Sequence, residues 1–94
     1  MKISDYLGHG RESAVPRRRL RELIRLPDRD IRRMIEQERR GGCPIVADNR
    51  RGYWIADNPD EARQFVRSMY HRSEEIRRTA AAVEKAAGFD GRGN

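Results

Sequence analysis

Arginines recur on one side of a predicted helix between residues 28 and 40. Opposite Ile31, this side carries a charged set: Arg29, Arg33, Glu36 and Arg40, with Arg32 and Gln37 at its flanks. A planar guanidinium can make two parallel hydrogen bonds to a phosphate or to O6 and N7 of guanine. Because a helix in the major groove reads bases mainly with its N-terminal residues, we expect base contacts from Arg29, Arg32 and Arg33. Glu36 either accepts from cytosine or pairs with a neighbouring arginine (Arg32, Arg33 or Arg40), and we favour the ion pair.

The positive charge is concentrated in the first 56 residues. They hold 14 Lys or Arg against 8 Asp or Glu and carry the whole net charge of +6, whereas the last 38 residues are neutral. Nineteen of the 21 bases are arginine, the side chain best suited to planar, two-point contact with phosphate. A GC-rich genome and a solvated surface would explain the arginine excess but not its segregation. We therefore expect a phosphate-bearing partner.

Two further arginine groups flank this helix in the sequence. Arg17, Arg18 and Arg19 begin the preceding predicted helix, where they are placed to hold phosphates; a solvated helix face is the alternative. Arg50 and Arg51 lie at the tip of a predicted hairpin. There they would reach adjacent phosphates or a minor groove, and a plain polar turn is the alternative.

Breakers and apolar spacing define the helices of this half. A first helix of at most two turns is predicted from Ile3, Tyr6 and Leu7, and residues 13–15 are predicted to be extended. Pro16 favours the start of the next helix, whose apolar face comprises Leu20, Leu23 and Ile24.

The turn between the second and third predicted helices is Leu26-Pro27-Asp28. Pro27 disfavours helix at Leu26, and Asp28 is expected to be the N-cap of the third helix. That helix is predicted to run to Arg40, because Gly41-Gly42 follows.

A β-hairpin is predicted next, with strands at residues 43–47 and 53–56 around a polar tip. Ile45, Tyr53 and Ile55 alternate and should dock on the helices, so Trp54 faces the other way. A lone tryptophan is more often buried than exposed to a partner. We expect Trp54 to be buried, against Phe65 or Tyr70.

One long helix is predicted after the hairpin, since acidic residues follow Asn58-Pro59 and no breaker appears before Gly88. Small and apolar residues recur along it at alternating steps of four and three, as in a coiled coil. The row comprises Ala62, Val66, Met69, Ser73, Ile76, Ala80, Val83 and Ala87. Phe65 and Tyr70 widen it only in the first half, so the second half, with Ile76, Ala80 and Val83, is the expected dimerisation surface.

The order of helix, turn, helix and hairpin resembles a winged helix-turn-helix domain, with the usual apolar positions at Leu20, Ile24, Leu26, Ile31 and Met34. Three stretches resemble small winged-helix proteins of phages and prophages: Asp30-Ile31-Arg32-Arg33-Met34-Ile35, Arg39-Arg40-Gly41-Gly42-Cys43-Pro44-Ile45 and Arg51-Gly52-Tyr53-Trp54-Ile55-Ala56. The likeness covers roughly residues 3–80 and is shared with the DNA-reading domain of biotin-repressor-type regulators. It implies DNA binding in phage replication or transcription control.

The chain departs from this pattern at three positions. Arg21 replaces a small residue that allows close helix approach, and Arg25 replaces the glycine that opens the turn, so a different crossing angle is possible. Glu38 replaces a leucine on the side of Ile31. We expect Glu38 to pair with a neighbouring arginine or to turn its face of the helix toward solvent.

No catalytic or metal-binding pattern is present in the sequence. It contains no glycine-rich phosphate loop, no His-Glu metal motif and no nucleophile with a base, so we expect a non-enzymatic protein without cofactor or metal. Cys43 is the single cysteine and is expected to be structural. With no membrane-length apolar run and no secretion signal, a cytoplasmic location is expected.

These patterns predict a mainly α-helical protein with a small β-hairpin. Residues 1–57 form the winged domain, 58–88 form a long C-terminal helix that packs on it, and 89–94 form a flexible tail. The expected function is sequence-specific binding of double-stranded DNA by a homodimer. The alternative is a module that binds a partner protein through the C-terminal helix. RNA and membrane surfaces are not favoured.

Overall fold

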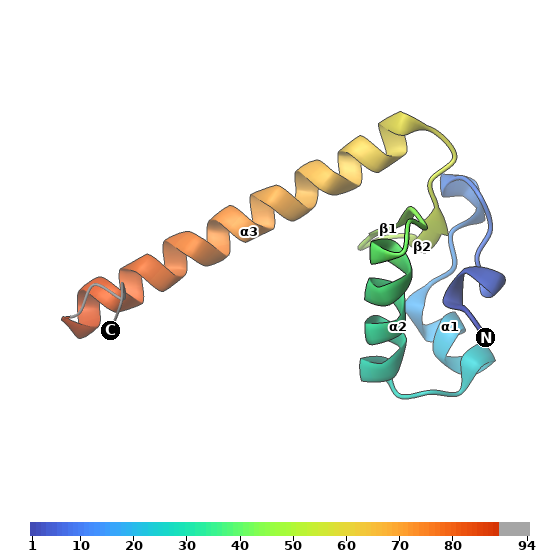
Figure 1. Ribbon diagram of the computed structural model, residues 1–94, viewed down its shortest axis with the longest axis horizontal. Coiled ribbons are helices and arrows are strands. Elements are labelled where there is room, and N and C mark those ends of the chain that lie inside the picture. The colour runs from blue at the N-terminus through green and yellow to red at the C-terminus, as the bar shows by residue number, and fades with distance from the viewer. Residues whose placement is uncertain (89–94) are drawn as a thin grey trace.

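The computed structural model describes residues 1–88. Three α-helices, two short 3-10 helices and one antiparallel hairpin follow in this order: η1 (Ile3–Tyr6), η2 (Arg11–Ser13), α1 (Arg17–Ile24), α2 (Asp28–Arg40), β1 (Ile45–Asp48), β2 (Gly52–Ile55) and α3 (Pro59–Ala87). Figure 1 shows α1, α2 and the hairpin gathered at one end, with α3 extending away from them. The predicted helical class, hairpin and long C-terminal helix are confirmed, and the tail at 89–94 lies outside the described residues.

A small aliphatic core holds the first half together. It comprises Ile3, Leu7, Leu20, Ile24, Ile31, Ile35, Ile45 and Ile55, with Leu26, Met34 and Tyr53 packed partly buried against it. Leu23 was predicted to join the core face of α1, but its side chain is exposed. The helix is only two turns long, so Leu20 and Ile24 are enough to cover its contact with α2.

The connection between α1 and α2 has a left-handed residue. Arg25, which caps α1, has φ 61° and ψ 38°, the conformation that the usual glycine would supply. Arg21 is exposed, so its length does not separate the two helices. The prediction that Asp28 caps α2 was wrong: Pro27 is the N-cap, and Asp28 is the first helical residue.

Glu38 has a role that the sequence pattern did not predict. Its carboxylate accepts hydrogen bonds from the backbone N–H groups of Ile3, at 2.6 Å, and Ser4, at 2.9 Å. The expected ion pair with an arginine was therefore wrong. Glu38 instead satisfies the free N–H groups at the start of η1 and holds the N-terminal segment on α2.

The hairpin pairs Ile45 with Ile55 and Val46 with Trp54. The core-facing residues Ile45, Tyr53 and Ile55 are confirmed, and the opposite face buries Trp54 and Val46. Strand β2 also pairs through Tyr53 with Val15, where the chain enters α1. At Gly52, φ is +107° and a side chain would collide with the backbone of Val15 and Pro16, so a residue other than glycine would push the hairpin from α1.

Helix α3 begins with a cap from Asn58, whose side-chain oxygen accepts from the Glu61 N–H at 3.0 Å. The first turns contact β1, while residues from Val66 to Val83 expose their side chains to solvent. This projection gives the molecule extents of 48 × 30 × 25 Å. None of the helices within residues 1–88 combines the length and apolarity needed to cross a membrane.

Replacing Arg25 by glycine tests the strained turn. The left-handed conformation costs a residue with a Cβ about 1 kcal/mol, so we expect Arg25→Gly to raise the free energy of unfolding by about 0.5–1 kcal/mol. Arg25→Ala keeps the Cβ and is the control that should show no such gain. Urea unfolding measures both, and equal stabilities for the two variants would contradict the account of the turn.

Candidate nucleic-acid interface

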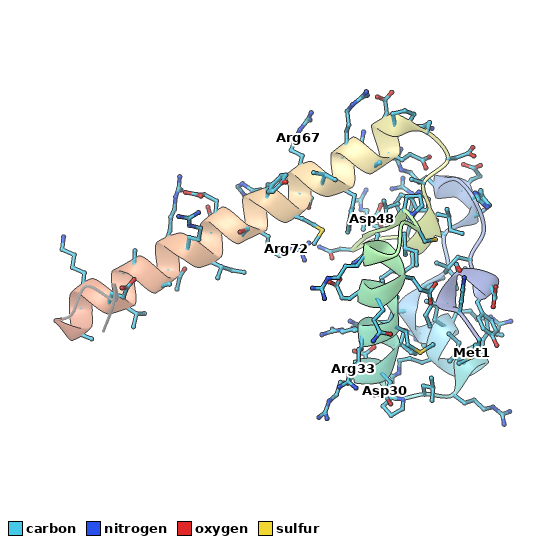
Figure 2. The ribbon with its side chains drawn as sticks, in the orientation of Figure 1. Met1, Asp30, Arg33, Asp48, Arg67 and Arg72 are labelled. Atoms are coloured by element: carbon cyan, nitrogen blue, oxygen red, sulfur yellow. The ribbon has the colours of Figure 1, made fainter. Side chains whose placement is uncertain are left out.

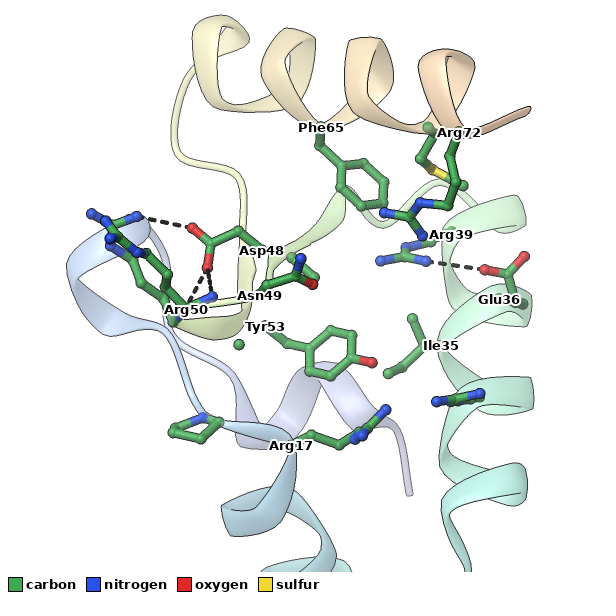
Figure 3. A pocket seen from close by; sticks show the side chains of 16 residues that line it. Arg17, Ile35, Glu36, Arg39, Asp48, Asn49, Arg50, Tyr53, Phe65 and Arg72 are labelled. Atoms are coloured by element: carbon green, nitrogen blue, oxygen red, sulfur yellow. Dashed lines mark hydrogen bonds and ion pairs between the residues drawn. The ribbon is translucent and has the colours of Figure 1, made fainter. Parts of the chain in front are cut away.

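Three separately predicted arginine groups meet around one pocket of about 640 Å³ (Figure 3). The start of α1 contributes Arg17, α2 contributes Arg32 and Glu36, and the hairpin tip contributes Arg50 and Arg51. Helix α3 closes one side with Phe65, Met69 and Arg72. Six guanidinium groups, that of Arg39 included, thus face only two carboxylates, those of Glu36 and Asp48. Such a surface attracts polyanions.

The remaining arginines of α2 point outward. Arg29, Arg33 and Arg40 are exposed on the side opposite Ile31, as the helical spacing predicts. Figure 2 shows Arg33 at the end of α2 that lies away from α3. These three side chains form an exposed ridge beside the pocket, and we call it the outward ridge.

Arg39 is turned inward. Its Nε donates to the Ile45 carbonyl oxygen at 2.7 Å, and its guanidinium lies 4.6 Å from the ring centre of Phe65. It also pairs with Glu36 at 3.0 Å. Arg39 therefore connects α2, β1 and α3 through a hydrogen bond, an ion pair and a cation–π contact.

Acidic partners divide the predicted arginines into paired and unpaired members. Asp28 pairs with Arg32 at 3.2 Å and Arg17 at 3.5 Å, so it joins the starts of α1 and α2. Arg19 pairs with Glu22, and Arg51 with Asp48. Within residues 1–88, four of the predicted arginines have no ion pair: Arg18, Arg29, Arg33 and Arg50. The guanidinium groups of these four residues can bind a new anion without first breaking an ion pair with an acidic side chain.

Glu36 forms ion pairs with arginines, the alternative that the sequence favoured over a hydrogen bond from cytosine. Its partners are Arg39, at 3.0 Å, and Arg40, at 3.9 Å. Of the three predicted partners only Arg40 is present, because Arg39 turns toward β1 and takes the closer position. Glu36 thereby partly neutralises the C-terminal end of the outward ridge.

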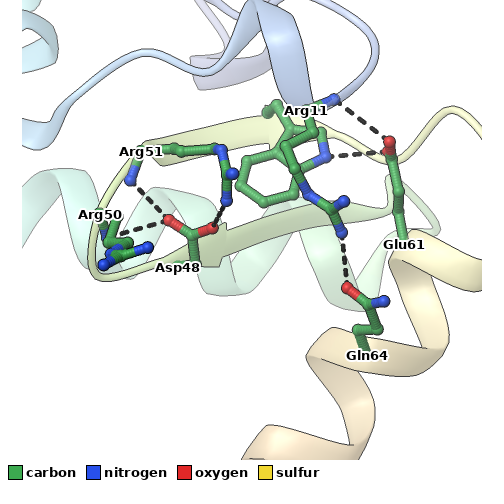
Figure 4. A network of polar contacts seen from close by, with 7 residues as sticks. Arg11, Asp48, Arg50, Arg51, Glu61 and Gln64 are labelled. Carbon is green, nitrogen blue, oxygen red and sulfur yellow. Dashed lines mark hydrogen bonds and ion pairs between the residues drawn. The ribbon is translucent and has the colours of Figure 1, made fainter.

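Asp48 shapes the hairpin tip. Its Oδ1 accepts from the backbone N–H groups of Arg50 and Arg51, and its Oδ2 pairs with the Arg51 guanidinium at 2.9 Å (Figure 4). Burial tends to raise the pKa of Asp48, but these hydrogen bonds and the charge of Arg51 together lower it below its ordinary 3.8. Both arginine side chains are exposed, but Asp48 holds the guanidinium of Arg51 and not that of Arg50.

Glu61 joins three parts of the chain. Its carboxylate accepts from the Trp54 indole N–H at 2.9 Å and from the backbone N–H groups of Asp57, at 3.0 Å, and Arg11, at 3.2 Å (Figure 4). The hydrogen bond from Asp57 is the largest cause that lowers the pKa of Glu61; burial opposes it, and the contacts from Trp54 and Arg11 add to it. The burial of Trp54 is confirmed. Arg11, 5.8 Å from its ring centre, and Glu61 contact it; of the two predicted neighbours, Phe65 lines a pocket together with Trp54, whereas Tyr70 is 74% exposed.

The sequence pattern did not identify Arg72, Tyr53 or Phe65 as part of this surface. A signal was available for two of them: Glu61, Phe65 and Arg72 recur at helical spacing on one face of α3, and that face lies over the hairpin. Tyr53 was assigned to the core, and it packs there as well as lining the pocket.

None of the predicted dimerisation residues lines the pocket. Ile76 is 64% and Val83 60% exposed, and Ala80 is also exposed. Within the part of the chain that the structure describes, no three His, Cys, Asp or Glu side chains are arranged to hold a metal ion. Cys43 is half-buried beside the core.

In comparisons with known proteins, this chain matches no family model, no curated protein and no solved structure.

The Glu61 network predicts how stability depends on pH. Because the pKa of Glu61 is lowered on folding, the unfolded chain binds more protons as the pH falls through the ordinary value of 4.5. The network therefore stabilises the fold fully above that pH and less below it. We expect Glu61→Gln to be less stable than the parent at pH 7 and the difference to shrink below pH 4.5, measured by urea unfolding.

Glu74→Gln is the matched control for this experiment, since Glu74 lies exposed on the far half of α3. It should change stability little at either pH. A difference between Glu61→Gln and the parent that stays constant with pH would contradict the network's role.

Proposed function

We propose that this protein is a winged-helix protein that binds double-stranded DNA, with α2 as the recognition helix and the hairpin as the wing. The observation that carries this proposal is the meeting of arginines from α1, α2 and the hairpin tip on one face of a small domain. The order of helix, turn, helix and hairpin supports it. Phage replication or transcription control is the setting that fits such a small DNA reader.

The ion pairs suggest which arginines do what. Arg29 and Arg33 are unpaired, exposed and near the N-terminus of α2, so they are placed to read guanine edges in a major groove. Arg18 and Arg50 are unpaired at either side and would hold phosphates. Arg17 and Arg32 share Asp28, so they would contact DNA only by giving up part of that ion pair.

A module that binds a partner protein is the second candidate. It is favoured by the exposed apolar side chains on the far half of α3, which the domain itself leaves uncovered. The two candidates use different surfaces. Substitutions on the outward ridge would abolish DNA binding and leave binding through α3 unchanged.

Two triple variants with equal change in charge test the DNA proposal. Arg29→Ala, Arg33→Ala and Arg50→Ala together remove unpaired arginines, whereas Arg19→Ala, Arg32→Ala and Arg51→Ala remove paired ones. We expect the first set to weaken duplex binding by about 100-fold or more and to lower the salt slope by about one per lost phosphate contact. The second set should weaken it several-fold less.

Fluorescence anisotropy with a random-sequence duplex at about 50 and 200 mM salt measures these effects, and selection from a random duplex pool shows whether bases are distinguished. If the parent protein shows no duplex binding at the lower salt, the proposal is wrong. Equal losses from both variants would contradict the assignment of DNA contact to the unpaired arginines rather than the paired ones.

A further inference from the structure

Five large apolar side chains of α3 are exposed: Val66 (46%), Met69 (41%), Tyr70 (74%), Ile76 (64%) and Val83 (60%). Four of them lie on one face of the helix, in the row of small and apolar residues that spans Ala62 to Ala87. This row is rotated by roughly 60–70° from the face of Glu61, Phe65 and Arg72 that contacts the rest of the molecule. Figures 1 and 2 show that most of α3 projects away from the rest of the molecule. The fold therefore leaves most of the row uncovered, although Met69 in its first half also lines the pocket.

We propose that a second copy of this chain covers the row, and that the two α3 helices pack antiparallel with Val66 opposite the partner's Val83. The same register places Met69 opposite the partner's Ala80 and Ser73 opposite the partner's Ile76. Met69 and Ile76 thus meet the smaller Ala80 and Ser73 of the partner, while Val66 and the partner's Val83 form an apolar pair between these levels and the ends of the contact. All four apolar residues of the row are then covered in both copies.

Charge selects this arrangement over a parallel one. In the antiparallel register Arg63 lies beside the partner's Glu84, and Tyr70 lies beside the partner's Arg77, where the cation can sit on the ring. In a parallel pair the same heptad positions would bring Arg72 next to the partner's Arg77 on both sides of the contact, so like charges would face each other. The row is the same in both cases, so the flanking residues decide the direction.

The length of the contact is sufficient for a stable pair. Residues 62–87 overlap completely, over about 38 Å of helix. A coiled-coil contact of this length buries on the order of 1,200 Å², the lower end of the range for specific interfaces. Three positions of the row are alanine, which lets the helices approach closely: Ala62, Ala80 and Ala87.

A consequence for DNA follows, and this step alone rests on the proposed function. The two Ala62 residues would lie about 38 Å apart, close to the roughly 34 Å between successive turns of one DNA face. The dimer would then present its two hairpins and recognition helices to neighbouring turns of the duplex.

Sedimentation equilibrium without DNA tests the pairing. We expect a mass twice the 11.0 kDa of one chain, and a monomer for Ile76→Asp. The Ile76 side chain is largely exposed, so the substitution should not unfold the domain, and near-ultraviolet circular dichroism of Trp54 checks this. A parent protein of monomer mass, or a dimer that Ile76→Asp leaves intact, would overturn the proposal.

Cysteine cross-linking tests the direction. In a Cys43→Ala background, Val66→Cys and Val83→Cys are prepared separately and then mixed. The antiparallel register predicts that oxidation joins the mixture into a dimer but leaves each variant alone as a monomer, because only unlike positions face each other. Efficient cross-linking of either variant by itself would show a parallel pair and overturn the register.

Charge exchange provides an independent readout. Arg63→Glu and Glu84→Arg should each raise the dimer Kd about five- to tenfold, and the double variant should restore it. Lys85→Glu makes the same charge change as Arg63→Glu on the opposite side of the helix and should have little effect. A double variant no tighter than the single ones would contradict the pairing of Arg63 with the partner's Glu84. None of these measurements involves DNA, so failure of the DNA proposal would leave them unaffected.

Discussion

The carboxylate of Glu61 is the interaction on which the placement of the other parts depends. It accepts from the N-terminal segment at Arg11, from the hairpin at Trp54 and from the start of its own helix at Asp57. An ionised carboxylate that accepts several N–H bonds is a strong and directional junction. It sets where α3 leaves the domain, and so it places Phe65 and Arg72 over the hairpin. The stacking of Arg39 on Phe65 and the contacts of the first turns with β1 add to this junction.

The same principle recurs in the rest of the small domain. Glu38 accepts hydrogen bonds from the backbone of η1, Asp28 forms ion pairs that join α1 to α2, and Asp48 accepts the hydrogen bonds that form the hairpin tip. Each acid of this kind satisfies backbone or guanidinium donors that an aliphatic core of eight residues could not hold in position. The acids are thus consumed internally, and the surface retains an excess of arginines. The use of the acidic side chains inside the fold therefore explains both how the elements are held together and why the surface is positively charged.

The elements of the fold could be predicted closely, and their junctions could not. Pro16, Leu26-Pro27 and Gly41-Gly42 mark the ends of α1 and α2 by local backbone chemistry, and Asn58-Pro59 marks the start of α3. Glu38 and Glu61 were different, because their partners lie 35 and 50 residues away along the chain. Local patterns carry no information about such distant backbone N–H groups. For the same reason the exposure of Arg29 and Arg33 followed from helical spacing, whereas the pairing of Arg17 with Asp28 and the position of Arg72 required the tertiary structure.

The projection of α3 also has a consequence for how its amide protons exchange with solvent. In a single chain the first turns are tied to the hairpin, but the turns from Ser73 onward rest on local helix formation alone. Isolated helical segments of this length are only marginally stable in water, so their amide protons would exchange through local helix–coil opening. The amide protons of the hairpin exchange only when the whole domain unfolds. The first turns of α3 should thus be protected from exchange like the hairpin, whereas the turns from Ser73 onward should be protected little. Any contact that covers the outer turns would remove this difference in protection.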